Sequence, residues 1–264
     1  MTLFFSGAPL SAVSTEVGAL ISLMSARQQD SMLMLIRPTY VVAQNLMGLT
    51  KDPLNLAAEI SALDAAPETK NVTSHVVLGL QLMMLRYLFG VYSGALKAIP
   101  GAESVLNLHP MIKQIFSAFF IALTRIAVAR RNKGCRRLVL IRKAERTACM
   151  FDKWTHAPQS NYLPMKLLLE AEFASIKGKK KLASEKYKEA SDMASKSGFR
   201  MVEAMSHEHA GRHKFRLNDT SAATDSFKKA LTCYDEWGAR AKVEHLQEEL
   251  KLLYEAKDIP LPTV

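Results

Sequence analysis

Two stretches of the chain share one pattern, and this pattern decides the fold. From Gly178 to Ala190 the sequence reads Gly-Lys-Lys-Lys-Leu-Ala-Ser-Glu-Lys-Tyr-Lys-Glu-Ala, and from Asn218 to Ala230 it reads Asn-Asp-Thr-Ser-Ala-Ala-Thr-Asp-Ser-Phe-Lys-Lys-Ala. Each begins with a residue that tolerates a left-handed turn, followed by Ala at +5, an aromatic at +9 and Ala at +12. These offsets share one helix face, where small residues let two helices approach closely.

The turn residues recur along the chain, 40 to 44 residues apart, at Gly7, Gly48, Gly90, Gly134, Gly178 and Asn218. Ala at +5 and +12 also follows Gly7 and Gly90, whereas the Gly48 and Gly134 units lack the pattern. About twenty residues after most turns stands a second breaker: Pro67, Pro110, Gly198, Gly238 and, less sharply, the run Trp154 to Pro158. Alternating breakers at this spacing are typical of stacked helical hairpins.

The sequence therefore predicts an all-α protein, a right-handed superhelix of about six antiparallel, tetratricopeptide-like hairpins. It forms one domain, 1–264, with its best-defined repeats at 162–256 and a first repeat that looks truncated. Stacking of this kind leaves a long concave face and two edges. Pro38 is expected to bend or divide its helix. The predicted helices span 10–27, 30–47, 53–64, 72–89, 91–99, 111–132, 135–154, 162–177, 179–197, 200–217, 219–236 and 239–256.

Composition excludes several classes of protein. The chain is 48% hydrophobic and 23% charged, which is neither disordered nor fibrous. Three cysteines without CxxC spacing argue against a disulfide framework or a zinc finger and favour a reducing, cytoplasmic location. No secretion signal is visible. The apolar segment Met111 to Ala129 contains Lys113 and Arg125, so we expect a buried core helix rather than a membrane span.

Several segments resemble the helical-repeat region of large multidomain signalling proteins. Those proteins combine a protein-kinase-like domain, a predicted ATPase domain and often a sensor histidine kinase. Leu167-Leu-Leu-Glu-Ala-Glu-Phe-Ala-Ser-Ile-Lys-Gly178 is similar to their "LLEAELARLRG" segment. Further similar segments are Glu203–Arg212, Asp235–Leu246, Phe5–Leu10 and Gln44–Pro53. No phosphate-binding loop, kinase signature or histidine-kinase box accompanies them.

The resemblance implies a non-enzymatic protein-interaction scaffold in signal transduction, with no cofactor. The alternative is a regulatory fragment of a larger kinase/ATPase sensor protein, separated from its catalytic domains. A relic without a selected partner is a third hypothesis. The truncated first repeat also predicts homo-oligomerisation through the N-terminal repeat or poor solubility.

Basic residues form two clusters about one repeat apart, within a net charge of +10. One interpretation is a binding edge for an acidic or phosphorylated protein partner; the other is a solvated face that offsets helix dipoles. Specific nucleic-acid binding lacks support because no aromatic residues are interleaved with the clusters. The candidate partner-binding residues are Arg130, Arg131, Arg136, Arg137, Lys179, Lys180 and Lys181.

Other candidate sites favour structural roles. His209 and His213 have i, i+4 spacing, but no third metal ligand is identifiable, so structural histidines are favoured. Glu170 and Glu172 point to different sides of a helix, which disfavours joint acid–base catalysis, and Glu170 is expected to pair with Arg212. Trp154 and Trp237 are expected to pack between repeats. Cys149 and His156 are the nearest Cys–His pair, but a breaker separates them.

Overall fold

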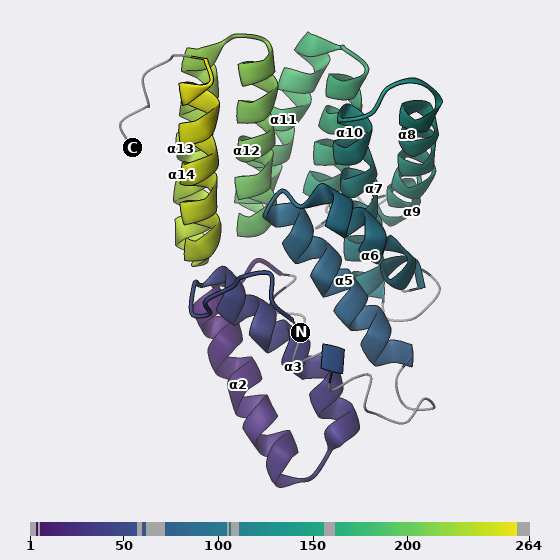
Figure 1. Ribbon diagram of the computed structural model, residues 1–264, viewed down its shortest axis with the longest axis vertical. Helices are drawn as coiled ribbons and strands as arrows, with labels where there is room; N and C mark the ends of the chain where they lie inside the picture. Colours follow the sequence, from purple (N-terminus) through teal and green to yellow (C-terminus); the bar gives the residue numbers. More distant parts are fainter. Residues whose placement is uncertain are drawn as a thin grey trace.

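Helices and their connecting turns make up the part of the chain described by the computed structural model, and no strand occurs there, which confirms the all-α prediction (Figure 1). The described residues are 4, 6–56, 60–61, 72–104, 106, 111–155 and 162–257. The helices are α2 (Leu10–Ala26), α3 (Asp30–Leu46), α5 (Val72–Leu88), α6 (Tyr92–Ser104), α7 (Met111–Arg130), α8 (Gly134–Ala148), α9 (Met150–Trp154), α10 (Leu163–Ile176), α11 (Lys180–Lys196), α12 (Arg200–Arg216), α13 (Thr220–Trp237) and α14 (Arg240–Glu255).

All six predicted turn residues have the left-handed backbone that the pattern requires, with positive φ at each of the five glycines and φ 64° at Asn218. Gly198 and Gly238, which belong to the second set of breakers, also have positive φ. The turn residues thus separate successive helices as predicted. Pro67 and Pro110, with the end of the Trp154 to Pro158 run, lie outside the described residues.

Consecutive helices pack as hairpins: α2 with α3, α5 with α6, α7 with α8, α10 with α11, and α12 with α13. A second set of contacts joins alternate helices, α3 to α5, α5 to α7, α7 to α10 and α10 to α12. One helix of each hairpin therefore contacts one helix of the next, and these inner helices carry the larger share of the core. The other helix covers the outside.

The small–aromatic–small pattern is buried where it is complete. Ala183, Tyr187 and Ala190 are each at most 1% exposed. The equivalent Phe227 lies so close to α12 that a Cβ added at Gly211 would come within 2.7 Å of its ring. The pattern fails in α2, where Ala12 and Ala19 are exposed and Val13 and Val17 are buried instead. The buried face of α2 therefore differs from the predicted one. This face is the one that packs on α3, the helix with which α2 makes its main contacts.

Several predicted boundaries differ from those observed. Residues 53–56 form a turn and irregular backbone rather than the start of helix 53–64, most of whose remainder lies outside the described residues. The predicted helix 135–154 is divided at Cys149 into α8 and α9. Pro38 does not divide α3, and α6 continues through Pro100 to Ser104.

The first and last hairpins contact each other, although they are far apart in sequence. The rings of Phe4 and Trp237 lie 6.0 Å apart, and a Cβ on Gly7 would stand 2.7 Å from the carbonyl oxygen of Gly198. Helix α3 also contacts α14. Figure 1 shows one end of the α2–α3 hairpin against the ends of α12 to α14. The array therefore curls back on itself, and the contact between its first and last parts adds to the predicted contacts between neighbouring hairpins.

Only α7 among the described residues has a segment, Ile112–Arg130, that is long and apolar enough to cross a membrane. In the structure 78% of its most apolar window is buried within the protein. Residues such as Phe116, Phe119 and Phe120 are fully buried, and Phe119 and Phe120 pack edge to face. This burial agrees with the prediction of a core helix.

Candidate functional site

The inner helices enclose a network of buried charges centred on two carboxylates. The first is Glu172 on α10, which is 4% exposed. It accepts hydrogen bonds from Arg130 Nη2 at 2.9 Å and from the Tyr187 hydroxyl, and it contacts His209 Nδ1 at 2.9 Å. Burial alone would raise the pKa of Glu172, but Arg130 and His209 outweigh burial and hold its pKa well below the ordinary value.

The second carboxylate is Glu208 on α12. It accepts hydrogen bonds from the Tyr234 hydroxyl at 2.8 Å, from Arg212 Nη2 at 2.7 Å and from the buried Lys242 Nζ at 3.2 Å. Burial opposes its ionisation, yet Lys242 and Arg212 lower its pKa below the ordinary value. Arg212 also pairs with Glu249 on α14. Because each carboxylate is fully partnered by protein, the network links α7, α10, α11, α12, α13 and α14 rather than awaiting a ligand.

The predicted pairing of Glu170 with Arg212 is therefore wrong. Glu170 is partly exposed and pairs with Lys186 at 3.3 Å, while the neighbouring Glu172 occupies the buried position. The two carboxylates do point to different sides of α10, as their spacing predicted.

The histidines His209 and His213 have structural partners. His209 contacts Tyr87 Oη at 3.1 Å with the ring nitrogen that does not face Glu172. His213 contacts Ser175 Oγ at 2.9 Å and the Lys180 carbonyl oxygen at 3.3 Å. Both nitrogens of each ring therefore have a protein partner.

A basic pocket of about 270 Å³ lies where α7, α10 and α12 end and α11 begins. No carboxylate contributes to its described lining. Arg130 is neutralised by Glu172, but the described residues provide no ion pair for Arg137, Lys180 or Arg216. The residues that line this basic pocket are Arg130, Arg137, Ser175, Ile176, Gly178, Lys180, His213, Arg216 and Leu217.

Like charges converge in the basic pocket. Burial first, and then the nearby Arg130 guanidinium, lower the pKa of Arg216 from its ordinary value. Burial also lowers the pKa of His213. Arg216 Nη2 lies 3.4 Å from Ser175 Oγ, and Arg137 Nη2 donates to the Ile176 carbonyl oxygen at 2.9 Å. A bound anion would relieve this repulsion and take up the remaining donors.

The structure separates the seven predicted binding residues. Arg130, Arg137 and Lys180 meet in the basic pocket, which unites the two sequence clusters. Arg131 instead lies over the Tyr92 ring, 4.9 Å from its centroid. Arg136 and Lys181 are exposed, and Lys179 lines a different hollow.

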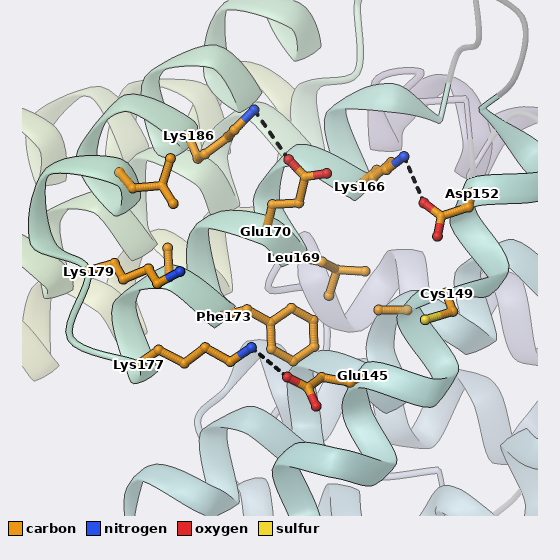
Figure 2. A pocket seen from close by; sticks show the side chains of 13 residues that line it. Glu145, Cys149, Asp152, Lys166, Leu169, Glu170, Phe173, Lys177, Lys179 and Lys186 are labelled. Carbon is orange, nitrogen blue, oxygen red and sulfur yellow. Dashed lines mark ion pairs between the residues drawn. The ribbon is translucent and has the colours of Figure 1, made fainter.

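That second hollow is an outer groove of about 380 Å³ between α8, α10 and α11 (Figure 2). Leu169 and Phe173 lie on its floor, and three ion pairs stand around it: Lys177–Glu145 at 2.6 Å, Lys166–Asp152 at 2.8 Å and Lys186–Glu170. The outer groove and the basic pocket meet at the Gly178 turn, because Lys177 and Lys179 line the groove while Ile176 and Lys180 line the pocket.

Sequence reasoning missed Arg216, Ser175 and His213 as lining residues of the pocket. Arg216 stands in the last turn of α12, and Arg130 ends α7, the inner helix two hairpins earlier. An arginine at the end of two inner helices was the sequence signal that could have identified Arg216. His213 was considered only as a metal ligand, and Ser175 carries no charge that would have drawn attention.

Comparisons with other proteins add no family assignment: no protein family, curated protein or solved structure matches this chain.

The three cysteines are free, with Cys135 and Cys149 exposed and Cys233 buried. His156 lies outside the described residues, so its distance from Cys149 is not part of the structure. One group of metal-ligating side chains occurs within the described residues, formed by Glu203, His207 and Cys233.

Proposed function

We propose that the protein is a non-enzymatic, cytoplasmic interaction scaffold in signal transduction that binds an acidic, phosphorylated segment of a partner protein. The observation that carries the proposal is the basic pocket, where Arg137, Lys180 and Arg216 converge without a carboxylate in the described lining. Each comes from a different hairpin, so the charges meet only in the folded chain. Phosphate groups are bound by clustered guanidinium and ammonium groups through short, charge-assisted hydrogen bonds.

The outer groove extends the same surface. Its apolar floor at Leu169 and Phe173 would receive apolar side chains of the partner segment, while the phosphate would occupy the basic pocket beyond the Gly178 turn. Three of the four lysines that line the groove are paired with carboxylates, so Lys179 is the groove residue that favours an acidic side chain in the segment. In this proposal the successive hairpins form a tetratricopeptide-like superhelix that curls on itself. Their positive-φ turns at 40 to 44-residue spacing support that arrangement.

The alternative of a regulatory fragment places the same pocket in a larger assembly. The phosphorylated segment would then belong to a kinase-like or ATPase domain encoded separately. The binding test below applies equally to both alternatives.

The test uses an immobilised library of acidic peptides, each present in phosphorylated and unphosphorylated form. We expect the protein to retain phosphorylated members selectively and to lose them at higher salt. The double variant Lys180→Ser/Arg216→Ser should bind at least about tenfold more weakly, since each charged hydrogen bond contributes about 1.5–3 kcal/mol. The matched control is Lys228→Ser/Lys251→Ser, which removes the same charge from exposed sites on α13 and α14. Equal losses in both double variants, or no preference for phosphorylated peptides, would contradict the proposal.

A further inference from the structure

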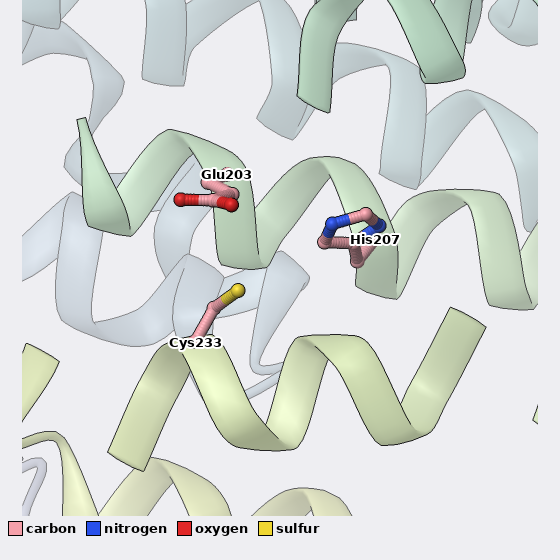
Figure 3. Close-up of side chains that lie close together, drawn as sticks. All are labelled: Glu203, His207 and Cys233. Atoms are coloured by element: carbon pink, nitrogen blue, oxygen red, sulfur yellow. The ribbon is translucent and has the colours of Figure 1, made fainter. Parts of the chain in front are cut away.

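Helices α12 and α13 bring together three different metal-ligating side chains. Glu203 and His207 are one helical turn apart on α12 and face α13, which carries Cys233 (Figure 3). Their ligand atoms, a carboxylate oxygen, an imidazole nitrogen and Sγ, all lie within 4.8 Å of one another. The close packing of α12 on α13, fixed by Phe227 against Gly211, holds the two helices at this separation.

The donor set selects for zinc-like ions. Sulfur and nitrogen ligands suit Zn²⁺ and disfavour Ca²⁺ and Mg²⁺, which prefer oxygen. Zinc bonds of about 2.0–2.3 Å place tetrahedral ligands about 3.3–3.8 Å apart. The observed spacing therefore requires a closure of about 1 Å. Rotation of the Glu203 and His207 side chains, both only partly buried, can supply it.

One of the three ligands, His207, faces a neighbouring hollow. This hollow is a cavity of about 390 Å³ between α11, α12 and α13. Asp192 and Asp225 line the same cavity, together with Lys188, Lys214 and Lys229. An ion that enters this cavity would meet His207 first, and water or Asp192 could complete its coordination. Three protein ligands and one open position are a common arrangement for zinc.

We infer that Glu203, His207 and Cys233 bind a single Zn²⁺-class divalent cation that links α12 to α13. Binding forms the Sγ–metal bond and releases the thiol proton to solvent, so no oxidant or reductant is needed. The site shares no lining residue with the basic pocket, so its test is independent of the proposed scaffold function.

The first experiment titrates the reduced protein, free of any polyhistidine tag, with Co²⁺ as a spectroscopic substitute for zinc. We expect one equivalent to bind with a thiolate-to-cobalt charge-transfer band and a tetrahedral visible spectrum. His207→Gln should weaken binding at least about tenfold, in line with the loss of one ligand. The control is Cys135→Ser/Cys149→Ser, which should keep the full spectrum. Binding without the charge-transfer band, or its loss in the control, would overturn the inference.

A second experiment leaves the three ligands unchanged. In the Cys135→Ser/Cys149→Ser background Cys233 is the only cysteine, because the chain contains three. Zinc at one equivalent should slow its alkylation by iodoacetamide at least about tenfold, since a metal-bound thiolate is shielded, whereas magnesium should have no effect. An alkylation rate unchanged by zinc would refute the site even if the ligand variants fail to fold.

Discussion

The N-terminal hairpin, α2 and α3, and the C-terminal repeats, residues 162–257, are built from similar helices that are stabilised differently. In the C-terminal repeats each helix has neighbours on two sides, and even Glu172, Glu208 and Lys242 are buried. In the N-terminal hairpin Leu20, Leu23 and Met32 are between 42% and 46% exposed. Exposed leucines also occur in the C-terminal repeats, at Leu182 and Leu252, so the difference between the two regions lies in the buried charges, which need partners from several helices.

The largest difference is expected from removing a buried charge in the C-terminal repeats. Glu208→Gln leaves Lys242 and Arg212 without their shared carboxylate and should lower the free energy of unfolding by about 3–5 kcal/mol. Urea denaturation followed by circular dichroism measures this. Glu16→Gln, at an exposed position of α2, is the control and should change stability by less than about 0.5 kcal/mol. Similar losses in the two variants would remove the contrast between the regions.

Replacing glycine by alanine should change the stability of the protein in opposite directions in the two regions. Gly211→Ala places a methyl group against the Phe227 ring, with no space for it, and should destabilise the protein by about 1–3 kcal/mol. Gly18→Ala in α2 meets only the Tyr40 side chain, at 3.4 Å, and should stabilise by about 0.5–1 kcal/mol through helix propensity. Thermal unfolding of both variants checks this, and a stabilising Gly211→Ala would show that α12 and α13 are less closely packed than described.

Mild acid should weaken the C-terminal repeats first. Burial, and then the positive charge of Lys229, lower the pKa of His207 to about 4. The unfolded chain therefore binds this proton more readily, and stability falls as the pH drops from about 6.5 towards 4. The loss from His207 is at most about 2 kcal/mol at pH 5.

Burial also lowers the pKa values of His213 and His245, whereas residues 1–56 contain no histidine. Hydrogen exchange at pH 7 and pH 5 should show opening of α12 before α3, and His207→Gln should reduce the difference between the two pH values. Uniform opening of both regions would contradict the assignment of acid sensitivity to these histidines.

The smallest effect on stability is expected at the exposed leucines of the N-terminal hairpin. Leu20→Lys/Leu23→Lys should change the free energy of unfolding by less than about 1 kcal/mol, because both side chains are already accessible to solvent. If the N-terminal repeat mediates self-association, as the sequence predicts, the same variant should shift the protein to monomer in sedimentation velocity. A wild-type protein that sediments as a monomer at all concentrations would end that prediction.

The sequence predicted local structure well and long-range structure poorly. Left-handed turns depend on single residues, so Gly178 and Asn218 could be identified directly. Buried Glu172 and Glu208 could not, because charged residues in a helix are normally solvated and their partners come from other hairpins. The basic pocket was anticipated through Arg130, Arg137 and Lys180, but Arg216 completes it only through the three-dimensional arrangement. The contact between Phe4 and Trp237 has no local sequence signal at all.

This contact has a mechanical consequence. Ordinary repeat arrays peel from their ends, because a terminal unit has one neighbour to lose. Here Phe4 and Leu10 rest on residues at the α13–α14 turn, so each end is braced by the other. Tension applied between the two termini should therefore load this junction first, and the chain should yield in one large step rather than unit by unit.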